Sequence, residues 1–415
     1  MEPTNWTFLG LVCIAAAVSF LAAVLFWPRV AGRGPKHLAA RTVLLGVCQL
    51  AMTTAIVLVT NKYFVFYASW SDLLDNGKSN VQVKQVQTQR GKEATPTGLV
   101  HRTTTDLGPK RRDQKHDPQK DGRVDRLQMR GPRSGLDAEA YVYLPPQYFQ
   151  PQFAHKRLPV VMLLSGGPSD DKLAWIRQAH LPEDIAKTVA AGRAQPVVYV
   201  MTRSAKALTQ PAQPPAGAGA GVGLPKHAAA AGVAPRPQTC LNLPGRSFGQ
   251  AEDLYTQDLP EAVGDLYRVA QSRKGWAVGG FGTSGQCAVR FAMLHSDRFA
   301  AGASVNGLFD LPGPVVDGPP GGPKGDLYGR SKVFQQDNDL LWRLEHLPPP
   351  PVSLLVAAGQ DSGRPAQQAD RIAALTRPPL NAEKLLVPGA PADLKSWRHR
   401  LPEVLGWLAA RVAPQ

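Results

Sequence analysis

The sequence has few cysteines and few acidic residues for its length. Its 415 residues include only 4 cysteines, Cys13, Cys48, Cys240 and Cys287. No two of them have the C-x-x-C spacing of zinc or thioredoxin-type sites, so we expect no metal site. Asp and Glu together number 32 against 47 Lys and Arg, which leaves a formal net charge of +15.

This shortage of acidic residues predicts an anionic partner. A pI near 9.8 favours binding to a membrane surface or to an anionic envelope polymer such as a cell-wall component. Nucleic acid is the other common partner of a basic chain. It is disfavoured here, because the positive charge is not interleaved with aromatic side chains and no recognised nucleic-acid-binding motif occurs.

Two long apolar runs predict a two-helix transmembrane hairpin over residues 1–70. They are Thr7–Trp27 and Thr42–Thr60, each close to the roughly 20 residues that cross a bilayer. The segment between them, Pro28–Arg41, contains several Arg and Lys residues and should therefore stay in the cytoplasm. The N-terminus and the whole chain after Thr60 would then be extracytoplasmic.

Other interpretations of these runs fit the sequence less well. A cleaved signal peptide would start with basic residues, whereas Glu2 is the first charged residue here and a second apolar run follows. Two buried helices of a soluble protein remain an alternative, although the runs are long for that role.

Two later segments have too few large apolar residues to fold. Residues 71–119 are polar and basic, which predicts a disordered tether that contacts anionic lipid or polymer, or serves as a plain spacer. Residues 204–237 are rich in Ala, Pro and Gly and predict a low-complexity loop insertion. The predicted folded domain is therefore 120–415.

Strands and helices alternate through this domain. The run Leu158–Leu164 is continuously apolar, as in a strand covered on both faces of a sheet. The pattern predicts an α/β domain with a mostly parallel sheet. The predicted strands are 124–129, 140–144, 158–164, 196–201, one that starts at Trp276, 301–305, 352–357 and 384–387, and the predicted helices are 181–191, 254–271, 366–375 and 394–412.

A glycine-rich joint at 276–288 connects a predicted strand to a helix. Gly280, Gly282 and Gly285 satisfy the G-x-G-x-x-G dinucleotide fingerprint. The acidic residue that this motif needs near the end of the next strand is not in place, so we expect no cofactor. A nucleophile elbow is the second interpretation, with Ser284 attacking an acyl carbonyl. Its base would be His399 and its orienting acid Asp361.

Residues 122–415 resemble the esterase family of α/β-hydrolases that includes bacterial cell-envelope mycolyltransferases. The resemblance implies an α/β-hydrolase fold and acyl-ester chemistry. It depends on several segments together, namely Gly131–Ser134 with Ala140–Pro146, the loop after Leu164, Trp276–Ala288, and Trp397–Pro402 with Leu405–Trp407.

The family's catalytic positions look vacated in this sequence. When the elbow is registered on Trp276 and Cys287, the nucleophile position falls on Gly282 and not on Ser284. The histidine position in the loop before Trp397 falls on Ala392 or a neighbour, and the family's histidine next to the oxyanion site is replaced in Leu164-Ser165-Gly166. Ser284 then fits a helix-capping role.

These residues lead to a functional prediction with one alternative. We expect an anchored, extracytoplasmic pseudoenzyme that binds an envelope ligand or an acyl ester in a cleft lined by Ser165, Gly166, Gly282, Thr283 and Ser284. The alternative is an active serine carboxylesterase or acyltransferase using Ser284. Because Cys240 and Cys287 both fall outside the membrane in this topology, we also predict that they form a disulfide. Two small buried thiols are the alternative there.

Overall fold

A computed structural model describes most of the chain and divides it into two units. The described residues are 6–30, 32, 34–64, 82–86, 98–109, 117–165, 173–203, 240–242, 250–309, 315–316, 325–326, 328, 331–389 and 393–415. The two compact units are Met1–Ser79 and Asn80–Gln415. The predicted insertion 204–237 lies outside the described residues.

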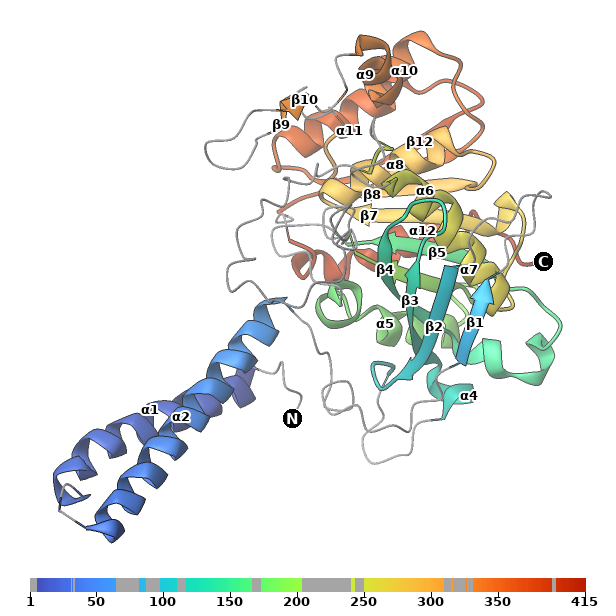
Figure 1. The fold of residues 1–415 in the computed structure, drawn as a ribbon. Helices are drawn as coiled ribbons and strands as arrows, with labels where there is room; N and C mark the ends of the chain where they lie inside the picture. Colours follow the sequence, from blue (N-terminus) through green and yellow to red (C-terminus); the bar gives the residue numbers. More distant parts are fainter. Residues whose placement is uncertain are drawn as a thin grey trace, which may run out of the picture. The chain divides into compact units, whose positions relative to one another are not determined.

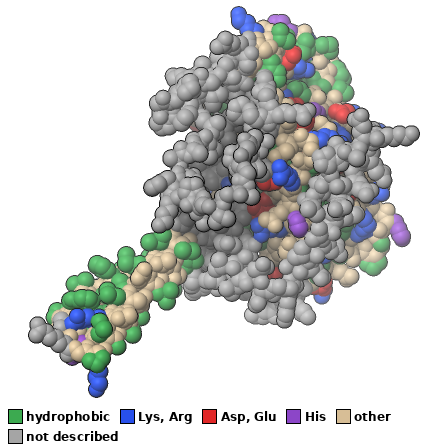
Figure 2. Space-filling model, viewed as in Figure 1, with side chains coloured by type: hydrophobic (Ala, Val, Ile, Leu, Met, Phe, Trp, Pro, Cys, Tyr) green, Lys and Arg blue, Asp and Glu red, His purple; other side chains and the backbone are tan. Residues whose placement is uncertain are grey.

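The first unit is a pair of long apolar helices, α1 (Trp6–Val30) and α2 (Pro35–Phe64). Mean hydropathy is 2.7 over Leu9–Val30 and 2.1 over Pro35–Val59. Among the described residues, every large exposed hydrophobic side chain except Val333 lies on these helices, and Figure 2 shows them along the hairpin. Length and composition are thus consistent with membrane anchoring.

The connection between the helices is shorter than the sequence predicted. Pro28 lies inside α1, and α2 starts at Pro35 rather than near Thr42. Proline at a first helical position has its φ angle already set for the helix, which explains this start. The Arg41 side chain donates to the carbonyls of Val30 (2.7 Å) and Gly32 (2.9 Å), so a predicted loop residue instead caps the end of α1.

The second unit is built on a 10-stranded sheet of order β1-β2-β3-β4-β6-β5-β7-β8-β11-β12 (Figure 1). The strands from β6 to β12 run parallel, and the pairs from β1 to β4 and β4 with β6 are antiparallel. The strands are β1 (Gln82–Val86), β2 (Gly98–Thr105), β3 (Arg123–Arg130), β4 (Asp137–Leu144), β5 (Val160–Leu164), β6 (Val198–Thr202), β7 (Trp276–Phe281), β8 (Ala301–Val305), β11 (Ser353–Gly359) and β12 (Asn381–Val387). A separate antiparallel pair consists of β9 (Val315–Val316) and β10 (Gly325–Asp326).

Helices connect these strands. Those longer than one turn are α5 (Leu181–Ala190), α7 (Leu259–Leu266), α8 (Thr283–Leu294), α9 (Lys332–Asn338), α10 (Leu340–His346), α11 (Arg364–Leu375) and α12 (Leu401–Ala409). The short ones are α4 (Pro118–Asp121), η1 (Pro146–Phe149), η2 (Pro151–Phe153), η3 (Ala174–Gln178), α6 (Ala251–Asp253), η7 (Leu254–Asp258), η8 (Arg273–Gly275) and η9 (Ser396–His399).

Helices cover both faces of the central strands. Val160, Met162 and Leu164 of β5 belong to the hydrophobic core that contains α7, α8 and α11. Helix α12 packs on the opposite face. It lies so close to β7 that a Cβ added at Gly279 would be 3.1 Å from the Leu408 side chain of α12 and 2.9 Å from that of Leu163. Burial on both faces explains why these strands are continuous apolar runs. The predicted α/β class with a mostly parallel sheet is confirmed.

The sheet extends beyond the predicted start of the domain. Residues 82–86 and 98–105, which the sequence assigned to a disordered tether, form β1 and β2 at one edge. For these residues the prediction was wrong. Strand β2 has only a few large apolar side chains, but its backbone donors and acceptors pair with those of β3, so its stability comes from ladder hydrogen bonds that composition does not reveal.

Two predicted helices are interrupted. The predicted helix 254–271 consists of the π-turn η7 and helix α7, and the chain is extended at Tyr267 (φ −129°, ψ 155°). The predicted closing helix 394–412 divides into η9 and α12 near Arg400. Pro260 and Pro402 lie in the first turns of α7 and α12, where their missing N–H groups mark the start of a new helix.

The predicted disulfide is present. Cys240 and Cys287 are bonded with a Cα–Cα distance of 5.8 Å across a sequence separation of 47 residues. Cys13 and Cys48 are free. The bond joins the residue that follows the 204–239 segment to the first half of α8.

We expect the double variant Cys240→Ser/Cys287→Ser to lose about 2 to 4 kcal/mol of unfolding free energy, because the bond restricts the unfolded chain. Chemical denaturation of the full chain in detergent measures this loss, and Cys13→Ser is the control because it removes a free thiol. Thiol titration of the denatured, unreduced wild type should find 2 free thiols; finding all four would contradict the bond.

Candidate functional site

The turn between β7 and α8 lies at the edge of the sheet where the parallel strands end. Gly282 occupies the turn with φ 59° and ψ −127°, a backbone conformation that is accessible essentially only to glycine without strain. Its N–H donates to the Val305 carbonyl of β8 (2.8 Å). In a nucleophile elbow the strained residue at this turn carries the nucleophile. Gly282 has a backbone conformation of this kind, and it has no side chain.

The turn is tight on both sides of Gly282. A Cβ at Gly280 would lie 2.0 Å from the Ser284 carbonyl oxygen, and a Cβ at Gly285 would lie 2.4 Å from Ser304 Oγ. Both distances are too short for any side chain. The glycines that match a dinucleotide fingerprint are thus required by the close approach of strand and helix.

Ser284 lies in the first turn of α8 and is 1% exposed. Its hydroxyl donates to the Ser165 carbonyl at 2.6 Å. A serine nucleophile instead gives its proton to a general base such as histidine, and a backbone carbonyl cannot take the proton. In this geometry Ser284 joins α8 to the end of β5.

Asp361 and His399 lie on other segments. Asp361 follows β11 and is exposed, and His399 is an exposed residue of η9 rather than of the long predicted helix. No hydrogen bond joins Ser284, Asp361 and His399 in the part of the chain that the structure describes. Two further predicted positions, Gly166 and Ala392, lie outside the described residues.

The turn nevertheless offers hydrogen-bond donors. The first N–H groups of a helix have no carbonyl partner within the helix, and in α8 they belong to Thr283, which is exposed, and Ser284. Such groups can bind a carbonyl or anionic oxygen. Among the described residues no group of three or more His, Cys, Asp and Glu side chains could hold a metal ion.

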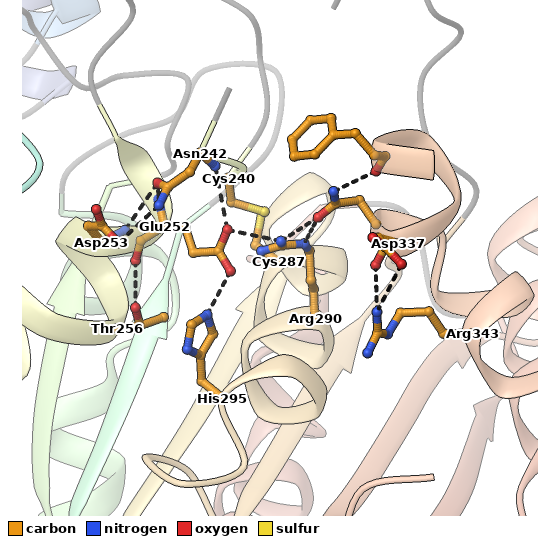
Figure 3. Close-up of polar contacts among 12 residues, drawn as sticks. Cys240, Asn242, Glu252, Asp253, Thr256, Cys287, Arg290, His295, Asp337 and Arg343 are labelled. Atoms are coloured by element: carbon orange, nitrogen blue, oxygen red, sulfur yellow. Dashed lines mark hydrogen bonds and ion pairs between the residues drawn. A yellow bond between two sulfur atoms is a disulfide. The ribbon is translucent and has the colours of Figure 1, made fainter. Parts of the chain in front are cut away.

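A buried polar network lies beside the disulfide on α8 (Figure 3). Arg290, 2% exposed, donates to Glu252 Oε2 (2.9 Å), and Glu252 Oε1 contacts His295 Nε2 (2.6 Å). Arg290 Nε also donates to Asn338 of α9 (3.2 Å). The Asn242 side-chain oxygen accepts from the Glu252 N–H (3.0 Å). The network thus joins α6, α8 and α9 with the segment that follows Cys240.

The network sets the charge state of Glu252. Burial alone would raise the pKa of its carboxyl, but the hydrogen bond from His295 and the positive charge and hydrogen bond of Arg290 outweigh burial. Together they lower the pKa of Glu252 to about 2. The carboxylate therefore stays ionised in the folded protein under all ordinary conditions.

The sequence analysis missed this network. Its one local signal is Arg290, a charged residue within the apolar run Ala288–Ala292. A charge on a fully buried helix face needs a buried partner. The partners Glu252 and Asn338 are far away in sequence, so the signal indicates a network but not its members.

Comparisons with known proteins identify the fold. No protein-family model and no curated protein matches the sequence. An S-formylglutathione hydrolase from Agrobacterium tumefaciens has a similar structure, with a TM-score of 0.50 and 15% identity over 70% of this chain and 96% of that chain. A ferulic acid esterase (TM-score 0.48, 18% identity, 69% and 97% covered) and a fluorophosphonate-binding serine hydrolase of Staphylococcus aureus (0.46, 14%, 69% and 98%) are also similar. The domain has the α/β-hydrolase fold.

We expect the stability that Glu252 contributes to depend on pH. Its pKa falls from 4.5 when unfolded to about 2 when folded, so the carboxylate stabilises the fold above about pH 4.5 by roughly 3 kcal/mol. This contribution is lost as the pH falls from about 4.5 to 2. The unfolding free energies of wild type and Glu252→Gln should therefore differ most near pH 6, and the difference should shrink steadily as the pH falls from about 4.5 to 2.

The matched control is Glu345→Gln. Glu345 pairs with Arg371 at the surface (3.1 Å), so its loss should cost at most about 1 kcal/mol. Denaturant titration of the full chain in detergent across this pH range gives both comparisons. A constant difference between wild type and Glu252→Gln would contradict the lowered pKa.

Proposed function

We propose that this protein is a membrane-anchored, extracytoplasmic pseudoenzyme with an α/β-hydrolase fold. It binds an envelope ligand, a lipid or a protein partner at the carboxyl edge of its sheet. The two apolar helices anchor it in the lipid bilayer, and the domain lies outside the cytoplasm. Candidate ligands are an acyl ester and an anionic envelope polymer.

The observation that carries this proposal is the glycine at the apex of the elbow. Gly282 has the strained backbone conformation that an elbow gives to its nucleophile, and it lacks a nucleophilic atom. The Ser284 hydroxyl, two residues later, donates to the Ser165 carbonyl. Serine catalysis needs a hydroxyl, a base and an orienting acid in one hydrogen-bonded chain.

Binding without catalysis remains chemically reasonable at this edge. The helix N-terminus supplies N–H donors and a partial positive charge, both of which suit a carbonyl or carboxylate oxygen. The turn between β7 and α8 is close-packed, so these donors keep fixed positions. A ligand could therefore be held by its polar group without being attacked.

The disulfide supports the extracytoplasmic placement. Structural disulfides persist in oxidising compartments outside the cytoplasm, and Cys240–Cys287 belongs to the folded domain. A reporter fused after Gln415 tests the placement in cells. Reporter activity on the cytoplasmic side would contradict the proposed topology.

An active serine esterase or acyltransferase using Ser284 is the second candidate function. The observation in its favour is that Ser284 lies beside the unpaired N–H groups at the start of α8, as an oxyanion site requires. Against it, His399 is exposed on η9 and makes no hydrogen bond with Ser284 among the described residues. Labelling with a fluorophosphonate probe, together with an ester-hydrolysis assay, distinguishes the two functions.

We expect no labelling of the full chain by a fluorophosphonate probe, because among the described residues no base is hydrogen-bonded to a hydroxyl at the elbow. Hydrolysis of short acyl esters should be at least about 10⁴-fold slower than by an esterase with a complete triad. Gel fluorescence and ester assays measure the two quantities.

Two variants show which hydroxyl is responsible if the probe does label the protein. Ser284→Ala removes the candidate nucleophile, and Thr283→Ala removes an exposed hydroxyl in the same turn as a matched control. Labelling that is lost in Ser284→Ala and kept in Thr283→Ala would refute the pseudoenzyme and establish the enzyme.

A further inference from the structure

A group of basic side chains lies at the edge of the sheet opposite the elbow. The loops that lead into the parallel strands all lie at the same edge of the sheet, here called the amino edge. The elbow lies at the opposite, carboxyl edge. Residues 154–157 lead into β5 and residues 267–275 lead into β7. The basic side chains of these two segments, Lys156, Arg157, Arg268, Arg273 and Lys274, define a cationic patch.

Backbone hydrogen bonds hold the patch together as one surface. The Leu158 N–H donates to the Arg268 carbonyl (3.2 Å) and the Ala270 N–H donates to the Leu158 carbonyl (2.9 Å). The C-terminal residues join both segments, because Gln415 N–H donates to the Arg157 carbonyl (2.9 Å) and Ala413 N–H to the Lys274 carbonyl (2.8 Å). Lys156, Arg157 and Lys274 are exposed.

The charges of the patch are not neutralised by carboxylates. Arg268 donates to the carbonyls of Phe153 (2.8 Å) and Ala154 (2.6 Å), and Arg273 donates to that of Pro351 (2.7 Å). Lys156 lies over the Phe153 ring, 5.1 Å from its centroid. Within the described chain no patch residue forms an ion pair. By contrast, Arg411 and Arg398 pair with Glu383 and Asp184.

Acidic side chains also lie along this edge. Asp265 near the end of α7 and Asp297 before β8 are exposed, and Asp106 follows β2 while Asp117 and Asp121 precede β3, several strands away. The two segments that form the patch contain no acidic residue. The patch therefore keeps a net positive potential, which attracts an anionic surface.

The chain also enters the domain at the amino edge. Strand β1 is antiparallel to β2, β2 to β3, β3 to β4 and β4 to β6. Strand β1 therefore runs in the same direction as the parallel strands and begins at the amino edge. The described part of the folded domain therefore begins, at Gln82, at the edge of the sheet that carries the patch.

Half-buried aromatic rings accompany the bases. Tyr148 and Phe149 of η1 and Phe153 of η2 lie between the end of β4 and the start of β5, again at the amino edge. Arg268 lies over Tyr148 (4.4 Å) and Arg123 over Phe149 (5.1 Å). All three rings pack against the hydrophobic core, and Tyr148 is of the type that proteins place at the headgroup level of a bilayer.

We propose that the cationic patch docks the domain onto anionic lipid headgroups of the bilayer that holds the two apolar helices. The carboxyl edge, with the elbow, then faces away from that bilayer. This inference rests on the anchoring part of the proposed function and not on whether the elbow is catalytic. A lipid surface is favoured over a soluble polymer because the covalent link to the helices keeps the domain close to the bilayer.

Lysine footprinting of the full chain tests the docking. The protein is reconstituted in vesicles of phosphatidylcholine alone or of phosphatidylcholine with phosphatidylglycerol, and lysine acetylation is followed by mass spectrometry. Lys156 and Lys274 should react more slowly with phosphatidylglycerol present, while the exposed Lys332 and Lys395 serve as internal controls. Protection should disappear between about 0.1 and 1 M salt, as the Debye length falls from about 10 to 3 Å.

A variant pair sharpens the test. Lys156→Gln removes one patch charge and should weaken docking about fivefold, read out as faster acetylation of Lys274. Lys332→Gln removes the same charge from α9 and should change nothing at Lys274.

The remaining outcomes overturn the proposal. Equal reactivity of Lys156 and Lys274 in both lipids would refute docking. Protection by added soluble polyphosphate but not by phosphatidylglycerol would assign the patch to a polymer. Extraction of the chain from vesicles by alkaline carbonate would refute the anchoring, and with it the docking, while leaving the pseudoenzyme proposal to its own probe assay.

Discussion

The close approach of β7 and α8 is the constraint on which the rest of the domain depends. The chain reverses direction within a few residues because a Cβ is absent at Gly280, where it would collide with the Ser284 carbonyl, and at Gly282, where φ is positive. This turn directs the first N–H groups of α8 toward the edge where the parallel strands end. It also fixes the face of α8 that carries Cys287 and Arg290, to which the disulfide and the buried network attach.

The backbone geometry of this turn, with a glycine at the residue of positive φ, shows that the fold and the reaction are separate questions. An elbow is needed for a helix to cover two neighbouring strands, whatever its side chains do. Likeness to esterases at 15% identity therefore speaks for the architecture, and chemistry must be argued from the site itself. At this site the first N–H groups of α8 lie at the end of β7, and the Ser284 hydroxyl donates to a backbone carbonyl.

The sequence predicted features that depend on residues within one segment, and it missed features that depend on contacts between distant segments. Strand β5 was predicted closely because burial on both faces makes it a continuous apolar run. Strand β2 was missed because an edge strand can be held by backbone pairing without a strong apolar pattern. The register that assigns the nucleophile position to Gly282 came from the resemblance to the esterase family, because the glycine spacing alone also fits a dinucleotide fingerprint and an elbow at Ser284. The Glu252–Arg290–Asn338 contacts were not, since they join residues that only the folded sheet brings together.

The disulfide has a consequence for how this protein can vary. The segment between β6 and α6 leaves the sheet after Arg203, whose carbonyl accepts from the Tyr255 hydroxyl (2.8 Å), and it is fixed again at Cys240. With both ends held, each doubling of the intervening length costs only about 0.6 kcal/mol of closure entropy. Insertions and deletions between these two points would therefore leave the register of the sheet unchanged.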